Sequence, residues 1–265
     1  MKTITLLLVL LLNLSAGIIK APILSIDEEN QTAVIEVKKI DLGMSGFVVH
    51  NIAPKHSSIL KDAVVTSFDA ASSRATIKLS DFEGLRNNAL PSGKWKLQVG
   101  DVAIFAFAYS RALLIAPSEE IYHQISKSVN IQWVHPDIFA TVLSFRGHPT
   151  PLKEDFKAMS IAGSVGLLFI YLDQKVYMLD IQSFKILSIS QAPLVQDSVK
   201  LPFYSRVEKI EANWFGEGND ELQEYEPHYY ELLAEYNSKN KKLYEIIKAK
   251  GEKYEDALEF FELGE

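Results

Sequence analysis

Cysteine is absent from this 265-residue chain. Its absence excludes disulfides, thiolate catalysis, cysteine zinc sites and the lipid anchor of a bacterial lipoprotein, which needs a cysteine behind the leader. Positive charge is not in excess either, because 27 Lys and Arg residues stand against 34 Asp and Glu residues, a formal net charge of −7. Such a chain has no general attraction for phosphate backbones or anionic membranes, so we expect no nucleic acid partner.

Long apolar runs are missing beyond the N-terminus. There, a short basic segment at residues 1–3 precedes the apolar run 4–12, and small residues follow at 15–17. This order is typical of a secretory leader, whereas a bilayer span needs about 20 apolar residues. We expect residues 1–17 to be a signal peptide, with an uncleaved anchor reaching Ile19 as the alternative. The mature protein is then exported to the periplasm or the outer cell surface and has no membrane span.

The sequence also lacks the motifs of known catalytic centres, such as His-Glu-x-x-His, Gly-x-Ser-x-Gly or a phosphate loop. The best catalytic or metal-binding candidates come from one loop-rich region: His135, Asp137, His148 and Asp155. An imidazole beside a carboxylate can act as a general base or bind a metal. The alternative is structural, since His135-Pro136-Asp137 has the composition of a capped helix start. We predict that the chain is not an enzyme and holds no cofactor or metal ion.

One acidic run, Asp27-Glu28-Glu29-Asn30, suggests calcium by its composition alone. It lacks the alternating ligand spacing and the glycine of a calcium loop. We therefore predict a solvated turn between two strands.

The first part of the mature chain, residues 18–116, consists of short β-type runs separated by turn residues. The runs recur about every ten residues or somewhat more, a spacing typical of a small barrel or sandwich. Residues 102–107 form an unbroken apolar run, and the pattern predicts residues 111–116 as its hairpin partner. We expect a β-rich unit here.

The second part, residues 117–215, mixes helical and β patterns. Ser118 is a candidate N-cap with two glutamates in the following turn, which predicts a helix to about Val129. Two further helices and two strands are predicted from their periodicity: residues 136–144 and 151–159, and residues 165–171 and 175–179.

Negative charge gathers in the third part, residues 216–265. From residue 207 onward, 16 acidic residues face 7 basic ones, so residues 1–206 carry a net charge of +2. Residues 216–220 have the composition of a linker, and helical periodicity follows with many tyrosines. We predict an α+β protein: a small barrel or sandwich, a mixed α/β unit, and a helical acidic tail that is separable from the body.

Several short strings, taken in order, resemble the N-terminal domain of the plasminogen-binding proteins of Helicobacter and Campylobacter relatives. The resemblance covers about residues 21–194. Its strings are Gly46-Phe47-Val48-Val49-His50, Ala63-Val64-Val65, Asp81-Phe82-Glu83-Gly84-Leu85 with Ala89-Leu90-Pro91, Gly100-Asp101, Tyr109-Ser110-Arg111-Ala112-Leu113-Leu114-Ile115-Ala116-Pro117, Trp133-Val134-His135-Pro136-Asp137-Ile138-Phe139-Ala140, Gly147-His148-Pro149-Thr150-Pro151 and Asp180-Ile181-Gln182-Ser183-Phe184-Lys185.

The resemblance implies capture of host plasminogen through a C-terminal lysine on a variable tail. Kringle modules hold a cation and a carboxylate together, and a terminal lysine supplies both. This chain ends Leu263-Gly264-Glu265, so we expect any plasminogen binding to use internal pairs instead. The candidate partner-binding residues are Lys241 with Glu245, Lys248 with Glu252, and Lys250, because Lys and Glu four residues apart lie side by side on a helix. A solvated helix face without a partner is the alternative.

Three functions follow from these patterns. The first is an exported binding protein of the plasminogen-binding family, with host plasminogen as its partner. The second is a structural or assembly protein of the cell envelope, whose acidic, tyrosine-rich tail docks an envelope protein, since aromatic rings often anchor interfaces. The third is an uncharacterised hydrolase.

Overall fold

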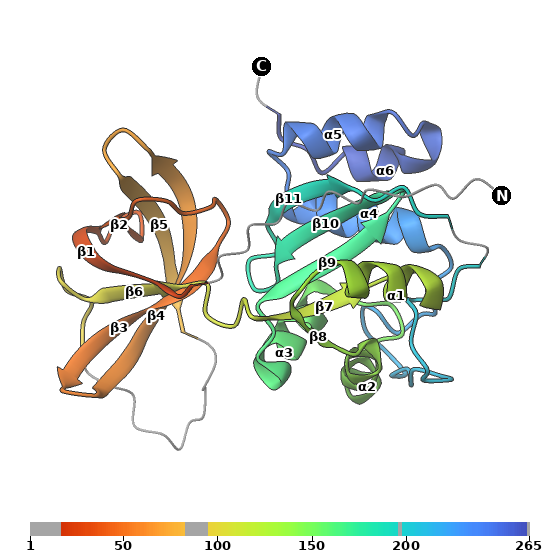
Figure 1. Ribbon diagram of the computed structural model, residues 1–265, viewed down its shortest axis with the longest axis horizontal. Coiled ribbons are helices and arrows are strands. Elements are labelled where there is room, and N and C mark those ends of the chain that lie inside the picture. Colours follow the sequence, from red (N-terminus) through yellow and green to blue (C-terminus); the bar gives the residue numbers. More distant parts are fainter. Residues whose placement is uncertain (1–16, 83–94, 196–197, 264–265) are drawn as a thin grey trace. The chain divides into compact units, whose positions relative to one another are not determined.

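The computed structural model describes residues 17–82, 95–195 and 198–263. These form two compact units, Ala16–Tyr109 and Ser110–Glu265, each with its own core (Figure 1). The predicted leader up to residue 16, the family-like strings within residues 83–91, and the last two residues lie outside the described residues. None of the described helices has the length and apolar character to cross a membrane.

The first unit is a six-stranded antiparallel barrel, which confirms the barrel alternative of the predicted β-rich unit. The strands close in the order β1-β2-β5-β4-β3-β6. Their bounds are β1 Ile19–Asp27, β2 Thr32–Glu36, β3 Ser45–Ala53, β4 His56–Asp69, β5 Arg74–Asp81 and β6 Val102–Phe105.

The core of the barrel forms because buried and exposed side chains alternate along its strands. In β5, Ala75, Ile77 and Leu79 are buried while the residues between them are more exposed, because successive side chains of a strand point to opposite faces. Closure between β3 and β6 depends on Gly46. A Cβ atom there would fall 2.1 Å from the carbonyl oxygen of Ile104, so only glycine allows the two strands to approach.

The predicted hairpin of residues 102–107 and 111–116 is wrong. β6 pairs with β1 and β3 of the barrel, whereas β7 (Arg111–Ile115) pairs in parallel with β8 (Gln132–Val134) and β9 (Leu167–Leu172) in a second sheet. The last four residues of β7 are fully buried. Such a continuous apolar run is typical of a strand covered on both faces, and it does not by itself specify the neighbouring strand.

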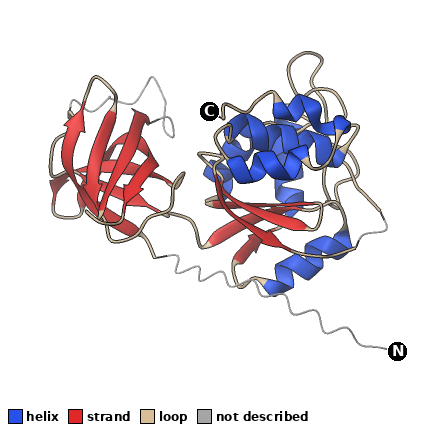
Figure 2. Ribbon diagram, turned by 90° about the horizontal axis from the view of Figure 1, so that it is seen from above, coloured by secondary structure: helices blue, strands red, loops and turns tan. Residues whose placement is uncertain are grey.

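The second unit contains a five-stranded sheet in the order β11-β10-β9-β7-β8. β10 (Lys175–Asp180) and β11 (Ile186–Gln191) continue from β9 as an antiparallel meander. Figure 2 shows helices on both sides of this sheet. They are α1 Glu119–Ser128, α2 Pro136–Arg146, α3 Lys153–Gly163, α4 Tyr225–Tyr236, α5 Lys241–Lys248 and α6 Glu255–Leu258, with a 3₁₀ turn η1 at Glu252–Tyr254.

Caps set the helix ends that the sequence predicted. Ser118 Oγ accepts a hydrogen bond from the backbone N–H of Ile121 at the start of α1. Pro136 occupies the first turn of α2, and that helix ends at Gly147, which has a positive φ of 72°. A left-handed residue at this place ends a helix because it redirects the chain. The mixed α/β character of this unit is confirmed.

The C-terminal helices complete the core of the second unit. Tyr229, Tyr230 and Leu233 of α4 are fully buried and share one apolar cluster with residues of β7, β9, α2 and α3. This packing argues against a tail that is separable from the body. Glu235, Glu245, Glu255 and Asp256 of these helices are exposed, while most of the buried side chains of these helices are aromatic or apolar.

Candidate functional site

The four catalytic candidates form two separate pairs. His135 Nδ1 lies 3.1 Å from a carboxylate oxygen of Asp137 at the start of α2, and His148 Nδ1 lies 2.8 Å from one of Asp155 beyond its end. An 11-residue helix rises 1.5 Å per residue, so its length separates the two pairs. No group of three or more metal-ligating side chains occurs among the described residues.

Each pair has a structural task. His135 accepts the backbone N–H of Asp137 as the N-cap of α2, as the capping alternative predicted. Desolvation opposes the charge of Asp137, but hydrogen bonds from Arg206 outweigh it and lower the pKa of this carboxyl. Asp155 is fully buried and accepts hydrogen bonds from Arg146 and from the backbone N–H of Leu152.

The acidic run at residues 27–30 forms the turn from β1 into β2, as predicted. Asp27 accepts hydrogen bonds from the backbone N–H of Asn30, at 3.0 Å, and from its side chain, at 2.7 Å. These contacts close a turn and need no bound ion.

Tyrosine hydroxyls fasten α4 to the sheet and to the segment that precedes it. Tyr225 donates to the carbonyl of Tyr171 at 3.0 Å, and Tyr229 donates to that of Pro202 at 2.9 Å. Both rings are buried. Tyr225 and Tyr229 therefore pack the helix onto its own body and are not available to anchor a partner.

A charged network fastens α5 and the 3₁₀ turn to the same sheet. Lys250 lies 3.1 Å from Asp173 in the β9–β10 turn and 3.5 Å from Glu226 of α4. Tyr254 donates its hydroxyl to Glu226 at 3.1 Å. Burial disfavours the charge of Asp173, yet the hydrogen bond and charge of Lys250 outweigh burial and lower the pKa of that carboxyl.

Helix α5 therefore has one fixed face and one free face. Leu243 and Ile247 are fully buried, and Asn240 caps the helix by accepting the backbone N–H of Leu243. The opposite face carries four exposed charged side chains, which we call the α5 charge cluster: Lys241, Lys242, Glu245 and Lys248. Within the described part of the chain, no ion pair involves any of these four.

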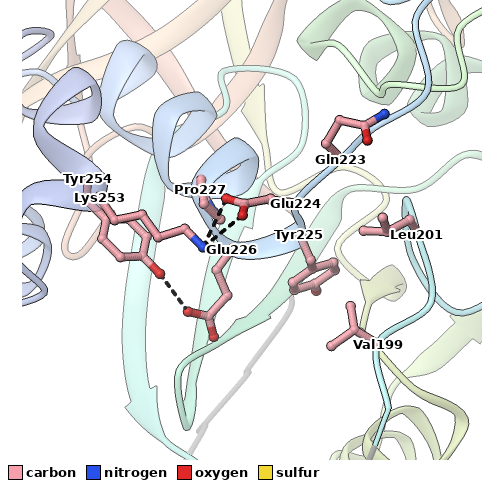
Figure 3. A pocket seen from close by; sticks show the side chains of 9 residues that line it. All are labelled: Val199, Leu201, Gln223, Glu224, Tyr225, Glu226, Pro227, Lys253 and Tyr254. Atoms are coloured by element: carbon pink, nitrogen blue, oxygen red, sulfur yellow. Dashed lines mark hydrogen bonds and ion pairs between the residues drawn. The ribbon is translucent and has the colours of Figure 1, made fainter.

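Two hollows flank the charged network. One, of about 500 Å³, is lined by Lys242, Glu245, Ile246, Ala249, Lys250, Asp173 and Lys175. The other, of about 350 Å³, lies between residues 199–201 and the start of α4 (Figure 3). Its polar side is already paired, since Lys253 binds Glu224 and Tyr254 binds Glu226. Only the first hollow adjoins the α5 charge cluster.

The five predicted partner-binding residues do not share one surface in the structure. Lys241 and Glu245 share one face of α5, as predicted. Lys248 and Glu252 are both exposed, but Gly251, with a positive φ of 90°, interrupts the helix between them. Lys250 points into the charged network and is not free. Lys242 was not among the predicted residues, although its spacing of three residues from Glu245 is the signal that could have identified it.

Comparison with known proteins assigns the chain to a family. The family described as "Plasminogen-binding protein pgbA N-terminal" matches residues 18–233. The chain belongs to this family. The resemblance that the sequence strings indicated is thus confirmed, and both structural units contribute to the family domain. The match ends within α4, so the α5 charge cluster lies beyond the matched residues.

Two curated relatives are both named Plasminogen-binding protein PgbA, from Helicobacter pylori strains J99 / ATCC 700824 and ATCC 700392 / 26695. Each is 28% identical to this chain over 181 residues, which are 67% of this chain and 38% of the relative. The aligned region therefore spans well under half of each relative. No solved structure matches the chain.

Proposed function

We propose that this chain is an exported binding protein that captures host plasminogen, with the α5 charge cluster as the contact for a kringle module. Family membership supports the choice of partner, because two relatives carry plasminogen binding in their names. The observation that carries the proposal is one exposed carboxylate, Glu245, flanked on the same helix by three exposed lysines. Together they offer a cation and a carboxylate side by side, which is what a kringle module holds.

Spacing supports this contact. Residues three or four apart on a helix have Cβ atoms about 5–6 Å from each other, and Glu245 is three residues from Lys242 and Lys248 and four from Lys241. Because these side chains are exposed, binding does not need to break a buried ion pair. Charged contacts of this kind are screened by salt, so the interaction weakens as ionic strength rises.

Rigidity of the helix supports the same site. The buried Leu243 and Ile247, the Asn240 cap and the Lys250 network hold α5 against the body. A helix fixed in this way presents its charges without an ordering cost for its backbone, and a smaller ordering cost raises affinity. Capture of a host protein also requires the chain to be outside the cytoplasm, so export to the periplasm or the cell surface is part of the proposal.

The experiment is a titration of plasminogen onto the immobilised whole chain, with and without 6-aminohexanoic acid, a free lysine analogue. We expect binding that the analogue abolishes, because it occupies the kringle site for a cation and a carboxylate. Binding that survives a saturating concentration of the analogue excludes this contact. A chain that binds no plasminogen at low ionic strength excludes the function.

A further inference from the structure

Two segments that meet at the C-terminal end of α2 carry three exposed aromatic side chains. Trp214, Phe215 and Phe145 are 90%, 88% and 87% exposed. Phe145 belongs to α2, whereas the other two lie in the irregular segment 208–217 that precedes α4. Each large aromatic side chain can bury roughly 150–250 Å². Three such side chains offer as much apolar area as the patches that mark interaction sites on folded proteins. We call these residues the aromatic cluster.

Hydrogen bonds tie the two segments together. They run from Asn213 N to Gly147 O at 3.0 Å, from Asn213 Nδ2 to Arg146 O at 2.7 Å, and from Glu211 N to Ser144 Oγ at 3.2 Å. In the sequence, Phe145 lies between Ser144 and Arg146, which accept two of these hydrogen bonds, and Trp214 directly follows Asn213. A Cβ atom on Gly147 would fall 2.2 Å from Cγ of Asn213. The chain therefore fixes the segment closely against α2 and still leaves its aromatic rings in water.

Negative charge predominates in the chain segment that carries Trp214 and Phe215, and we call its acidic residues the acidic rim. Residues 207–221 contain one exposed lysine, Lys209, and five exposed acidic residues: Glu208, Glu211, Glu217, Asp220 and Glu221. The neighbouring arginines do not balance this charge, because Arg146 is paired with Asp155 and Arg206 with Asp137. The cluster thus combines apolar rings with an acidic rim.

We propose that the aromatic cluster docks a basic amphipathic segment of a partner protein. Apolar side chains of the partner pack on the three rings, and flanking lysines or arginines face the acidic rim. Charge complementarity selects this occupant, because an anionic lipid surface or a second copy of the same acidic rim is repelled. This surface is distinct from the α5 charge cluster and does not depend on plasminogen binding.

The test uses two labelled helical peptides that share a leucine face and differ in their polar face, which is lysine in one and glutamate in the other. Fluorescence anisotropy measures their binding to the whole chain. We expect the lysine peptide to bind and the triple variant F145S/W214S/F215S to weaken it at least about tenfold. The variant E208Q/E211Q/E217Q should weaken binding and flatten its dependence on salt. The matched control L42S/I52S replaces two exposed apolar residues of the barrel unit and should leave binding unchanged.

Several results overturn the proposal. Failure of the lysine peptide to bind, equal binding of the glutamate peptide, or unchanged binding by the aromatic variant each removes its basis. Binding to phosphatidylcholine–phosphatidylglycerol vesicles that the aromatic variant abolishes assigns the cluster to lipid instead. A dimer in sedimentation velocity that the same variant dissociates assigns it to a second copy. Circular dichroism of each variant distinguishes loss of the surface from loss of the fold.

Discussion

Nζ of Lys250 lies 3.1 Å from Oδ2 of Asp173, although the two residues are 77 positions apart in the sequence. The same ammonium group lies 3.5 Å from Glu226 and over the rings of Tyr230 and Tyr254. One side chain therefore joins the β9–β10 turn, α4 and the end of α5. In the sequence, Lys250 is only one more lysine near an amphipathic helix, but in the fold it fixes the orientation of the helix that we propose as the binding surface.

Replacing Lys250 with methionine should lower the free energy of unfolding by about 1–2 kcal/mol, because two neighbouring carboxylates lose their shared cation. The side chain of Lys250 is 13% exposed, whereas that of Lys253, paired with Glu224, is 56% exposed. Lys253→Met is therefore the matched control and should cost at most about 1 kcal/mol. Urea unfolding of both variants checks this. Equal costs for the two substitutions would mean that the Lys250 network contributes no more than a surface pair.

A chain that ends at Asp220 should lose the cooperative melt of the second unit. Removing α4 and α5 exposes an apolar cluster to which Tyr229, Tyr230 and Leu233 contribute fully buried side chains. Loss of one such buried side chain lowers the free energy of unfolding by on the order of 2–5 kcal/mol. The net stability of a whole domain is only about 5–15 kcal/mol. Differential scanning calorimetry of the truncated and full chains makes the comparison. A truncated chain that keeps every transition would show that the helices are separable after all.

His228 should make stability fall in mild acid. Burial lowers the pKa of His228 from 6.5 to about 4, and its Nε2 lies 3.0 Å from the carbonyl oxygen of Pro151. Because the unfolded chain takes up this proton at a higher pH than the folded chain, the stabilising contribution is complete above pH 6.5 and is lost as the pH falls toward 4. The loss amounts to about 3 kcal/mol.

The measurement for His228 is urea unfolding at several pH values between 7 and 4, in the native chain and in His228→Gln. In the glutamine variant, the free energy of unfolding should lose the part of its pH dependence that His228 supplies. His56→Gln, at an exposed position of the barrel, is the control and should follow the native chain. Identical pH profiles for native and His228→Gln proteins contradict the buried neutral imidazole.

Local signals in the sequence predicted where helices begin better than they predicted which strands lie next to each other. Ser118 and Pro136 mark helix starts because capping depends only on the next few residues. The partner of β7 was mispredicted because burial on both faces leaves no alternation that specifies an adjacent strand. The period-two pattern of residues 18–116 likewise fits a sandwich and a barrel equally, since closure depends on contacts such as that of Gly46 with β6.

In the candidate site, too, the sequence predicts contacts between residues close in the chain but not contacts that form only in the fold. The pairing of Lys241 with Glu245 follows from helical spacing, so the sequence predicts that both lie on one face. The side chain of Lys250 points into the charged network because it pairs with Asp173 and Glu226, which approach it only in the folded chain. The aromatic cluster was also beyond prediction, because nothing local distinguishes Trp214 from a core residue.

Plasminogen affinity in two matched triple variants of the whole chain shows directly whether α5 carries the binding site. K241A/K242A/K248A removes the lysines of the α5 charge cluster, and K38A/K39A/K55A removes three exposed lysines of the barrel unit, so both variants change the net charge equally. We expect the first variant to weaken binding at least about tenfold and the second to leave it within about twofold of the native chain. Equal affinity in the two variants would contradict a plasminogen site on α5.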